Sequence, residues 1–227
     1  MAELLTASSQ PRQFNWVHQV ASSFNIIMNW DLTGFWVAPK ISSGKIKCSG
    51  GCTETCDVAI GNNTIAGVAK ETALREFEAE TGNSRTVLFF HEKLPFEHTV
   101  GKRERLQKQC YNVAFASAKF RTDLPREEGS EMGTPFTASF AEVLMGECVT
   151  GKFIPMHHEA HLRALPRFLE LLEEAENGSE DAAAAQKFAD ARHRLETEIA
   201  FALEKMRLPS LEAYADLVND EARRRIR

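Results

Sequence analysis

Short apolar runs that are typical of β-strands fill the first half of the chain. A turn-like segment, Asn-Trp-Asp-Leu-Thr-Gly, separates the first two runs and therefore predicts a hairpin. The third run alternates and leads directly into Gly50 and Gly51, which allow a sharp turn or a close approach of the backbone. We predict strands over residues 17–28, 35–38, 45–48, 86–91 and 111–120.

Helical periodicity appears first before Gly82 and then dominates the C-terminal third of the chain. Ala73, Leu74 and Phe77 form the apolar side of a predicted helix over residues 68–81, and Gly82 is its stop signal. Further helices are predicted over residues 156–176, 180–206 and 211–225.

The order of these elements favours an α/β domain over residues 12–175, with a helical C-terminal extension over residues 176–227. Residues 139–144 fit either a strand or the start of a helix. A long polar loop is expected over residues 52–67. Residues 94–109 are predicted to form a second loop, which carries a basic cluster. The basic cluster consists of Lys102, Arg103, Arg105 and Lys108.

The composition of the chain limits its number of domains, its partners and its compartment. The 227 residues are 43% hydrophobic, which is enough for one domain with a normal core. The net charge of −5 means that nucleic acid would have to be bound by a local basic patch. Because no apolar run could span a membrane and the N-terminus has no secretory pattern, we expect an intracellular protein, either cytoplasmic or organellar (mitochondrial). The five cysteines are expected to be reduced, and the four-residue spacing of Cys48, Cys52 and Cys56 is not typical of zinc sites.

Two carboxylates lie on one face of the first predicted helix. Glu76 and Glu80 are four residues apart, and Arg75 could hold a carboxylate with its planar guanidinium group. Paired carboxylates are the ligands that a hard divalent cation such as Mg²⁺ prefers. A solvated acidic helix face is the alternative interpretation of the same pattern.

The stretch from Arg75 to Gly82 resembles the second half of the signature of the Nudix hydrolase superfamily. That signature is Gly, five residues, Glu, seven residues, then Arg-Glu-hydrophobic-x-Glu-Glu-x-Gly. Arg75, Glu76, Phe77, Glu80 and Gly82 stand at matching positions. The box departs from the pattern at Ala79, where the superfamily has the first glutamate of its Glu-Glu pair, a residue that normally belongs to the metal site.

The first half of the signature can be placed in two ways. Without a gap, Gly61 is the leading glycine and Gly67 takes the position of the glutamate. With a gap, Gly50-Gly51 resembles the Pro-Gly-Gly that ends a strand in the superfamily, and Asp57 takes the position of the glutamate. We prefer the gapped placement, because it also accounts for the strands upstream and for the length of the loop.

The resemblance implies a Nudix-type α/β/α sandwich with a mixed sheet and a C-terminal helical extension. It also implies a pyrophosphohydrolase that acts on a nucleoside diphosphate linked to another group and uses Mg²⁺ or Mn²⁺. In that interpretation Glu76 and Glu80 are metal ligands and catalytic residues, and Arg75 orients them. Gly50 and Gly51 form the turn that the phosphates approach.

Three further groups of residues could contribute to such a site. The acidic turn over residues 126–133 could supply the missing carboxylate from Glu127, Glu128 or Glu131, or it could be an ordinary exposed turn. The basic cluster could contact phosphates, including those of an RNA 5′ end, or could be solvated. His157, His158 and His161 could line a substrate cleft, although partly exposed histidines without a catalytic role are the favoured interpretation.

The loss of the glutamate at position 79 supports an alternative function. A protein that kept the fold without full catalysis would bind a nucleotide or an RNA 5′ end as a subunit of an RNA-processing or mRNA-stability complex. The long C-terminal helices are suited to docking a protein partner.

Overall fold

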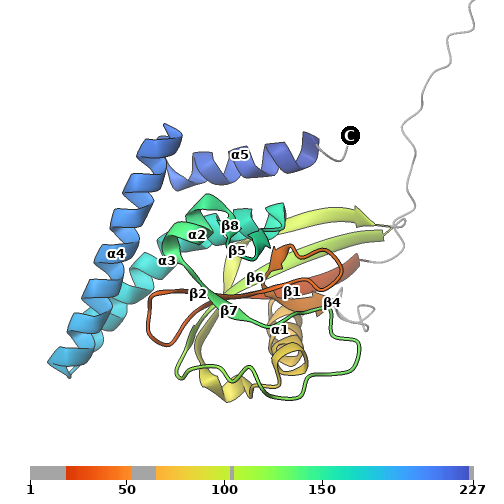
Figure 1. Cartoon of the computed structure of the whole chain (residues 1–227), viewed down its shortest axis with the longest axis horizontal. Coiled ribbons are helices and arrows are strands. Elements are labelled where there is room, and N and C mark those ends of the chain that lie inside the picture. Colours follow the sequence, from red (N-terminus) through yellow and green to blue (C-terminus); the bar gives the residue numbers. More distant parts are fainter. Residues whose placement is uncertain (1–18, 53–64, 103–104, 225–227) are drawn as a thin grey trace, which may run out of the picture.

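A mixed β-sheet forms the centre of the molecule (Figure 1). The computed structural model describes residues 19–52, 65–102 and 105–224. The strands of the sheet are β1 (Gln19–Met28), β2 (Gly34–Pro39), β3 (Ile46–Lys47), β4 (Ser49–Cys52), β5 (Leu88–Lys102), β6 (Arg105–Ala116) and β7 (Phe136–Ser139). Their order is β3-β2-β1-β6-β5, with β4 also paired to β1 and β7 also paired to β2. A separate small hairpin consists of β8 (Glu147–Cys148) and β9 (Gly151–Lys152).

Strand β1 contributes to both faces of the sheet. It pairs in parallel with β6 and antiparallel with β2 and β4. Successive side chains of a strand point to opposite faces, so Ile26 and Met28 pack into one hydrophobic cluster and Ile27 into another. Asn25 points to the same face as Ile27, where its side-chain amide donates to the carbonyl oxygen of Ala73 at 2.8 Å. A helix is thereby attached to that face by a hydrogen bond as well as by apolar packing.

Helices cover both faces of the sheet. Helix α1 (Ile65–Thr81) lies on one face, where Phe77 joins the cluster that contains Ile27. Helices α2 (Phe140–Met145) and α3 (Pro155–Gly178) pack into the larger cluster on the other face. Figure 1 shows α1 and α3 on opposite sides of the strands. The α/β/α sandwich with a mixed sheet is confirmed.

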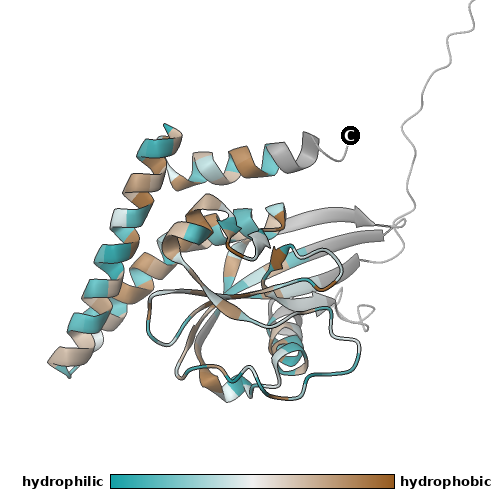
Figure 2. Cartoon of the chain, viewed as in Figure 1, coloured by the Kyte–Doolittle hydropathy of each residue, from teal (hydrophilic) through white to brown (hydrophobic). Residues whose placement is uncertain are grey.

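Two further helices, α4 (Ala182–Met206) and α5 (Leu211–Arg224), pack against α3 and contribute to the same hydrophobic cluster. Hydrophilic and apolar residues alternate along α4 (Figure 2), and its buried residues recur at helical spacing. In α5, the hydroxyl of Tyr214 donates to the carbonyl oxygen of Leu144 at 2.6 Å. The predicted division after residue 175 falls inside α3 and stays a prediction. None of the helices in the described part of the chain is long and apolar enough to cross a membrane.

The prediction of a loop over residues 94–109 is wrong. This segment forms most of an antiparallel hairpin, in which β5 and β6 pair from Leu88↔Ala116 to Lys102↔Arg105 with two register shifts. Leu94 is buried while the neighbouring Lys93 is partly exposed, because one face of the hairpin packs on the core and the other faces outward. The many charged residues of the segment gave it its loop-like composition.

Residues 139–144, for which the sequence left two structures open, form the start of α2. Ser139 is the N-cap, and its hydroxyl accepts a hydrogen bond from the backbone N–H of Glu142. The carboxylate of Glu142 in turn accepts from the backbone N–H of Ser139 at 2.8 Å, which completes a capping box. Strands β4 and β7 were not predicted.

Candidate functional site

Helix α1 carries the charged residues of the candidate site and ends where the sequence indicated. Gly82 follows its last residue with φ of 70°, a left-handed conformation that a glycine adopts without strain. Its N–H donates to the carbonyl oxygen of Glu78 at 2.8 Å, and a Cβ atom at this position would collide with the carbonyl oxygen of Pro125. A glycine is therefore required here for both conformation and space.

Glu80 is almost completely buried and is held from two sides. Its Oε1 lies 2.8 Å from Nζ of Lys47, and its Oε2 accepts the backbone N–H of Gly50 at 2.8 Å. Burial raises the pKa of Glu80, while the ammonium group of Lys47 and the Gly50 N–H oppose this rise and the neighbouring carboxylate of Glu76 adds to it. Lys47 was not predicted as a site residue. It is the principal residue that the structure adds to the candidate site.

Gly50 and Gly51 bring strand β4 against the carboxylates of α1. Gly50 has φ of 140°, and a Cβ atom there would collide with the backbone of β1. A Cβ atom on Gly51 would collide with Oε2 of Glu76. The strand and the carboxylates thus approach each other because neither glycine carries a side chain, and the expected turn at Gly50-Gly51 is part of β4 instead. This contact favours the gapped placement of the signature, although Asp57 lies outside the described residues.

Arg75 and Glu76 form the outer part of the site. Nη2 of Arg75 lies 2.6 Å from Oε1 of Glu76, and the Arg75 side chain is 54% exposed. Glu78 lies on a different side of the helix and binds Arg85, with Nη2 and Oε2 2.8 Å apart. That ion pair lowers the pKa of Glu78. The predicted residues Glu76, Glu80, Arg75, Gly50 and Gly51 are therefore brought together, and Glu78 is separate from them.

The assembled box and the mixed sheet between helical layers match what the resemblance implied. The fold is an α/β/α sandwich with a mixed sheet. No protein-family model matches the chain, and no curated protein matches it in sequence.

Solved structures similar to the chain include two of NrtR from Shewanella oneidensis. One shares 14% identity at a TM-score of 0.49 and covers 78% of this chain and 83% of its own. The other, the NUDIX domain of NrtR complexed with ADP ribose, shares 15% identity at a TM-score of 0.46 over 66% and 88% of the two chains. A NUDIX hydrolase from Nitrosomonas europaea shares 15% identity at a TM-score of 0.45 over 66% and 89%.

The residues present do not fit a divalent cation as they are arranged. Both carboxylate oxygens of Glu80 are engaged, Oε1 by Lys47 and Oε2 by Gly50. Oε1 of Glu76 is engaged by Arg75, and Ala79 supplies no carboxylate. Among the described residues, no group of three or more His, Cys, Asp or Glu side chains could hold a metal ion. The site is one of matched charges, with two cations beside two anions.

The acidic turn does not complete the metal site within the part of the chain that the structure describes. Glu131 binds Lys40, with Oε2 and Nζ 2.7 Å apart. Glu127 and Glu128 are exposed. The backbone N–H of Glu127 donates to the carbonyl oxygen of Ala79 at 2.9 Å, so the turn caps the end of α1 through its main chain. This arrangement fits the alternative of an exposed acidic turn.

The basic cluster lies at the tip of the β5–β6 hairpin instead of in a loop. Lys102 ends β5 and pairs with Arg105 at the start of β6, and Lys108 pairs with Thr99. Arg103 lies outside the described residues, as do the side chains of the other three. Their contact with phosphate stays a prediction.

The three histidines of α3 are core residues, so the prediction that they are partly exposed is wrong. His157, His158 and His161 are all buried on the face of the sheet opposite α1. The rings of Phe24 and Phe35 pack edge-on against His157 and His161 respectively. Burial lowers the pKa of both His158 and His161 to about 4. They are neutral near pH 7 and belong to the core, not to the candidate site.

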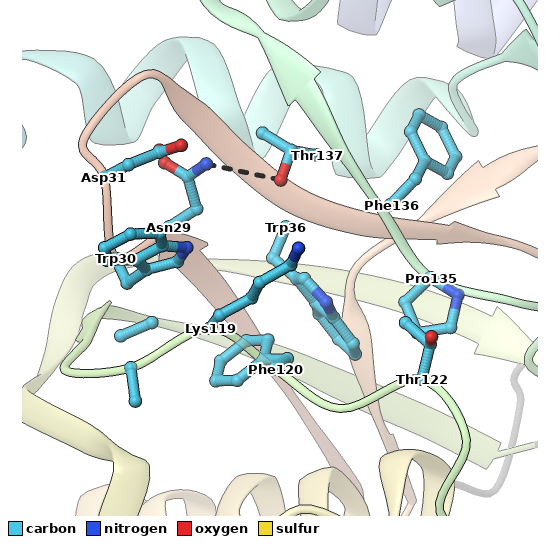
Figure 3. A pocket seen from close by; sticks show the side chains of 12 residues that line it. Asn29, Trp30, Asp31, Trp36, Lys119, Phe120, Thr122, Pro135, Phe136 and Thr137 are labelled. Carbon is cyan, nitrogen blue, oxygen red and sulfur yellow. Dashed lines mark hydrogen bonds between the residues drawn. The ribbon is translucent and has the colours of Figure 1, made fainter.

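A pocket lined by aromatic residues lies on the same face of the sheet as α1 (Figure 3). Its volume is about 280 Å³. Trp30 comes from the β1–β2 turn and Phe120 from the segment after β6, and Trp36 lies on β2. The rings of Trp36 and Phe120 are 5.0 Å apart and nearly perpendicular. Phe77, the residue after Glu76, contacts both of these rings and so connects the pocket with the box.

Proposed function

We propose that the chain is a Nudix-fold module that binds a nucleoside-diphosphate-linked ligand, with impaired catalysis. The observation that carries the proposal is the contact between Gly50 and Gly51 of strand β4 and the carboxylates of Glu76 and Glu80. The two glycines and the acidic face of α1 lie together, where the resemblance implies that the phosphates approach. The chemistry of the box differs in two respects: Ala79 supplies no carboxylate, and the carboxylates of Glu76 and Glu80 each have a cationic partner.

The balance of charge in the box supports binding of a diphosphate without a metal ion. Carboxylates alone would repel phosphate oxygens, but Lys47 neutralises Glu80 and Arg75 neutralises Glu76. The side chain of Arg75 is more than half exposed, and its guanidinium group has donors left for a second partner. Arg75 is therefore the residue of this site that is best suited to contact the diphosphate.

The aromatic pocket in Figure 3 supports the assignment of a nucleoside. A planar base stacks on aromatic rings irrespective of its identity, and such stacking contributes ~1–3 kcal/mol per base. Trp30 is 44% exposed, and Nζ of Lys187 lies 5.6 Å from the centre of its ring, so a base would stack on the part of the ring that Lys187 leaves exposed. Asn29 is held by a hydrogen bond from its Nδ2 to Oγ1 of Thr137 at 3.2 Å, which fixes the wall of the pocket.

An RNA 5′ end is a larger ligand of the same class, because it also carries a nucleoside joined to phosphates. The basic cluster at the tip of the β5–β6 hairpin supports this choice through its sequence, and a small nucleotide derivative is the other form. A protein partner would dock on the C-terminal helices, where Phe201 of α4 is 61% exposed. The same proposal includes a role for the chain as a subunit of an RNA-processing or mRNA-stability complex.

The second candidate function is a pyrophosphohydrolase acting on the same class of ligand. The pairing of Glu76 with Arg75 favours it, because this carboxylate is oriented and is 19% exposed at the outer side of the box. Catalysis with Mg²⁺ or Mn²⁺ would require Glu80 to leave Lys47, so it needs a rearrangement of the observed ion pair.

Binding and turnover measured on one panel separate the two functions. The panel contains nucleoside diphosphates, their sugar-linked derivatives and 5′-triphosphate RNA, each tested with Mg²⁺ and with a chelator. The proposal predicts binding without phosphate release, whereas release that requires Mg²⁺ and is abolished by Glu80→Gln would establish the hydrolase. Arg85→Gln, which alters an ion pair on another side of α1, is the matched control and should leave binding unchanged. Absence of binding to every member would refute both functions.

A further inference from the structure

The buried ion pair of the box carries a further inference about how the site works. We propose that the ammonium group of Lys47 permanently occupies the position at which a divalent cation would sit, so that the box is a metal-independent site with a built-in cation. The inference deepens the proposed function and rests on it for the identity of the ligand.

The surroundings of the ammonium group are those that a hard cation prefers. Nζ of Lys47 lies 2.8 Å from Oε1 of Glu80 and 3.4 Å from the carbonyl oxygen of Gly50. Carboxylate and backbone carbonyl oxygens are the ligands that Mg²⁺ and Ca²⁺ take from proteins. A bound metal ion and this ammonium group would therefore compete for the same oxygens.

Burial makes the lysine difficult to displace. The side chains of Lys47 and Glu80 are only 8% and 9% exposed. If a metal ion took Glu80, it would leave the ammonium group buried beside a second cation and without its anionic partner. The backbone N–H of Gly50 holds the other oxygen of Glu80 and fixes the carboxylate in the orientation that Lys47 uses.

Ala79 and Lys47 together change the charge of the box in a way that compensates for a missing divalent cation. Ala79 removes one negative charge relative to the Nudix pattern, and Lys47 adds one positive charge. Together they shift the charge of the site by the same amount as one Mg²⁺ ion. A box that had merely lost a catalytic glutamate would keep an uncompensated carboxylate at position 80, whereas here that carboxylate has a buried partner.

The experiment uses Mn²⁺ alone and measures its binding to the full chain by electron paramagnetic resonance of the free ion. The wild type is compared with Glu80→Gln, Ala79→Glu, and the double variant Lys47→Met/Ala79→Glu. Lys40→Met serves as the matched control, because it removes a lysine from a more exposed ion pair with Glu131. Circular dichroism establishes that each variant is folded.

We expect the wild type, Glu80→Gln, Ala79→Glu and Lys40→Met to show the same weak Mn²⁺ binding. The double variant should bind Mn²⁺ at least about tenfold more tightly, because it restores a carboxylate and removes the competing ammonium group. Tight Mn²⁺ binding by the wild type that is lost in Glu80→Gln would overturn the inference. So would tight binding by Ala79→Glu alone, or a folded double variant that binds no better than the wild type.

The design remains decisive if the double variant does not fold. Ala79 is only partly buried, so Ala79→Glu is compatible with the fold, and its failure to bind Mn²⁺ while Lys47 is present supports the inference. Nucleotide binding in the presence of a chelator is measured separately. Loss of that binding with unchanged Mn²⁺ results would contradict the proposed function and leave the role of Lys47 intact.

Discussion

The two faces of the central sheet bury polar groups in opposite ways. On the face covered by α1, Lys47 and Glu80 are buried as a charged pair. On the face covered by α3, His158 and His161 are buried among aromatic rings, and burial lowers the pKa of each to about 4, so they are neutral near pH 7. The fold therefore keeps a charged side chain buried where a partner of opposite sign is provided: Glu80 has Lys47 in the box, and Glu159 of α3 has Arg163, with Oε1 and Nε 3.0 Å apart.

The largest effect is expected from breaking the buried ion pair. Lys47→Met leaves the carboxylate of Glu80 buried without its cation, and we expect the free energy of unfolding to fall by ~3–5 kcal/mol. Lys47→Met/Glu80→Leu removes both charges and should be clearly more stable than Lys47→Met alone. Urea unfolding of the wild type, Lys47→Met, Glu80→Leu and the double variant measures the coupling energy. Additive effects would show that the pair does not act as a unit.

The histidine face should lose stability in acid. Because the folded pKa of His158 and of His161 is about 4, below the unfolded value of 6.5, protonation favours the unfolded chain. Stability from these groups is complete above about pH 6.5 and decreases as the pH falls toward 4, by about 3 kcal/mol for each histidine. Urea unfolding across this range tests the expectation. Replacing His161 or His158 by phenylalanine should make the free energy of unfolding less dependent on pH, if the variant folds.

The aromatic pocket should affect binding without affecting folding. Trp30→Ala removes an exposed ring and is expected to weaken nucleotide binding by ~1–3 kcal/mol. Its effect on unfolding should stay within ~0.5 kcal/mol, as for most surface substitutions. Titration calorimetry and thermal unfolding measure the two quantities. Phe201→Ala, an exposed aromatic on α4, is the control, and equal loss of affinity in both variants would remove the pocket from the ligand site.

The smallest effect is expected from an ion pair at the surface. Lys40 and Glu131 lie 2.7 Å apart, as close as Lys47 and Glu80, but their side chains are 31% and 63% exposed. Lys40→Met should therefore lower the free energy of unfolding by less than about 1 kcal/mol. A loss as large as that of Lys47→Met would mean that burial is not what distinguishes the two pairs.

Features that depend on local sequence were predicted correctly. The helix before Gly82 follows from the spacing of Ala73, Leu74 and Phe77, and its glycine stop is confirmed by the positive φ. The three C-terminal helices were predicted to within a few residues at each end, because each has a long apolar periodicity between clear breaks. The family resemblance put Gly50-Gly51 and this helix in one signature, and in the structure these glycines contact the carboxylates of Glu80 and Glu76.

Features that depend on distant contacts were missed. Lys47 and Glu80 are separated by 33 positions, and no local pattern indicates that they pair. The only signal in the sequence was the position of Lys47 in a short predicted strand that precedes Gly50-Gly51. The alternation of that strand alone would place Lys47 on an outward face. The burial of His157, His158 and His161 likewise depends on aromatic residues of distant strands that cover them.

Titration of a nucleoside diphosphate into the wild-type chain, with a chelator and then with Mg²⁺, tests the central claim most directly. If Lys47 is the built-in cation of the box, the ligand binds in the chelator, and Mg²⁺ leaves its affinity unchanged. Binding that appears only with Mg²⁺ would contradict the account.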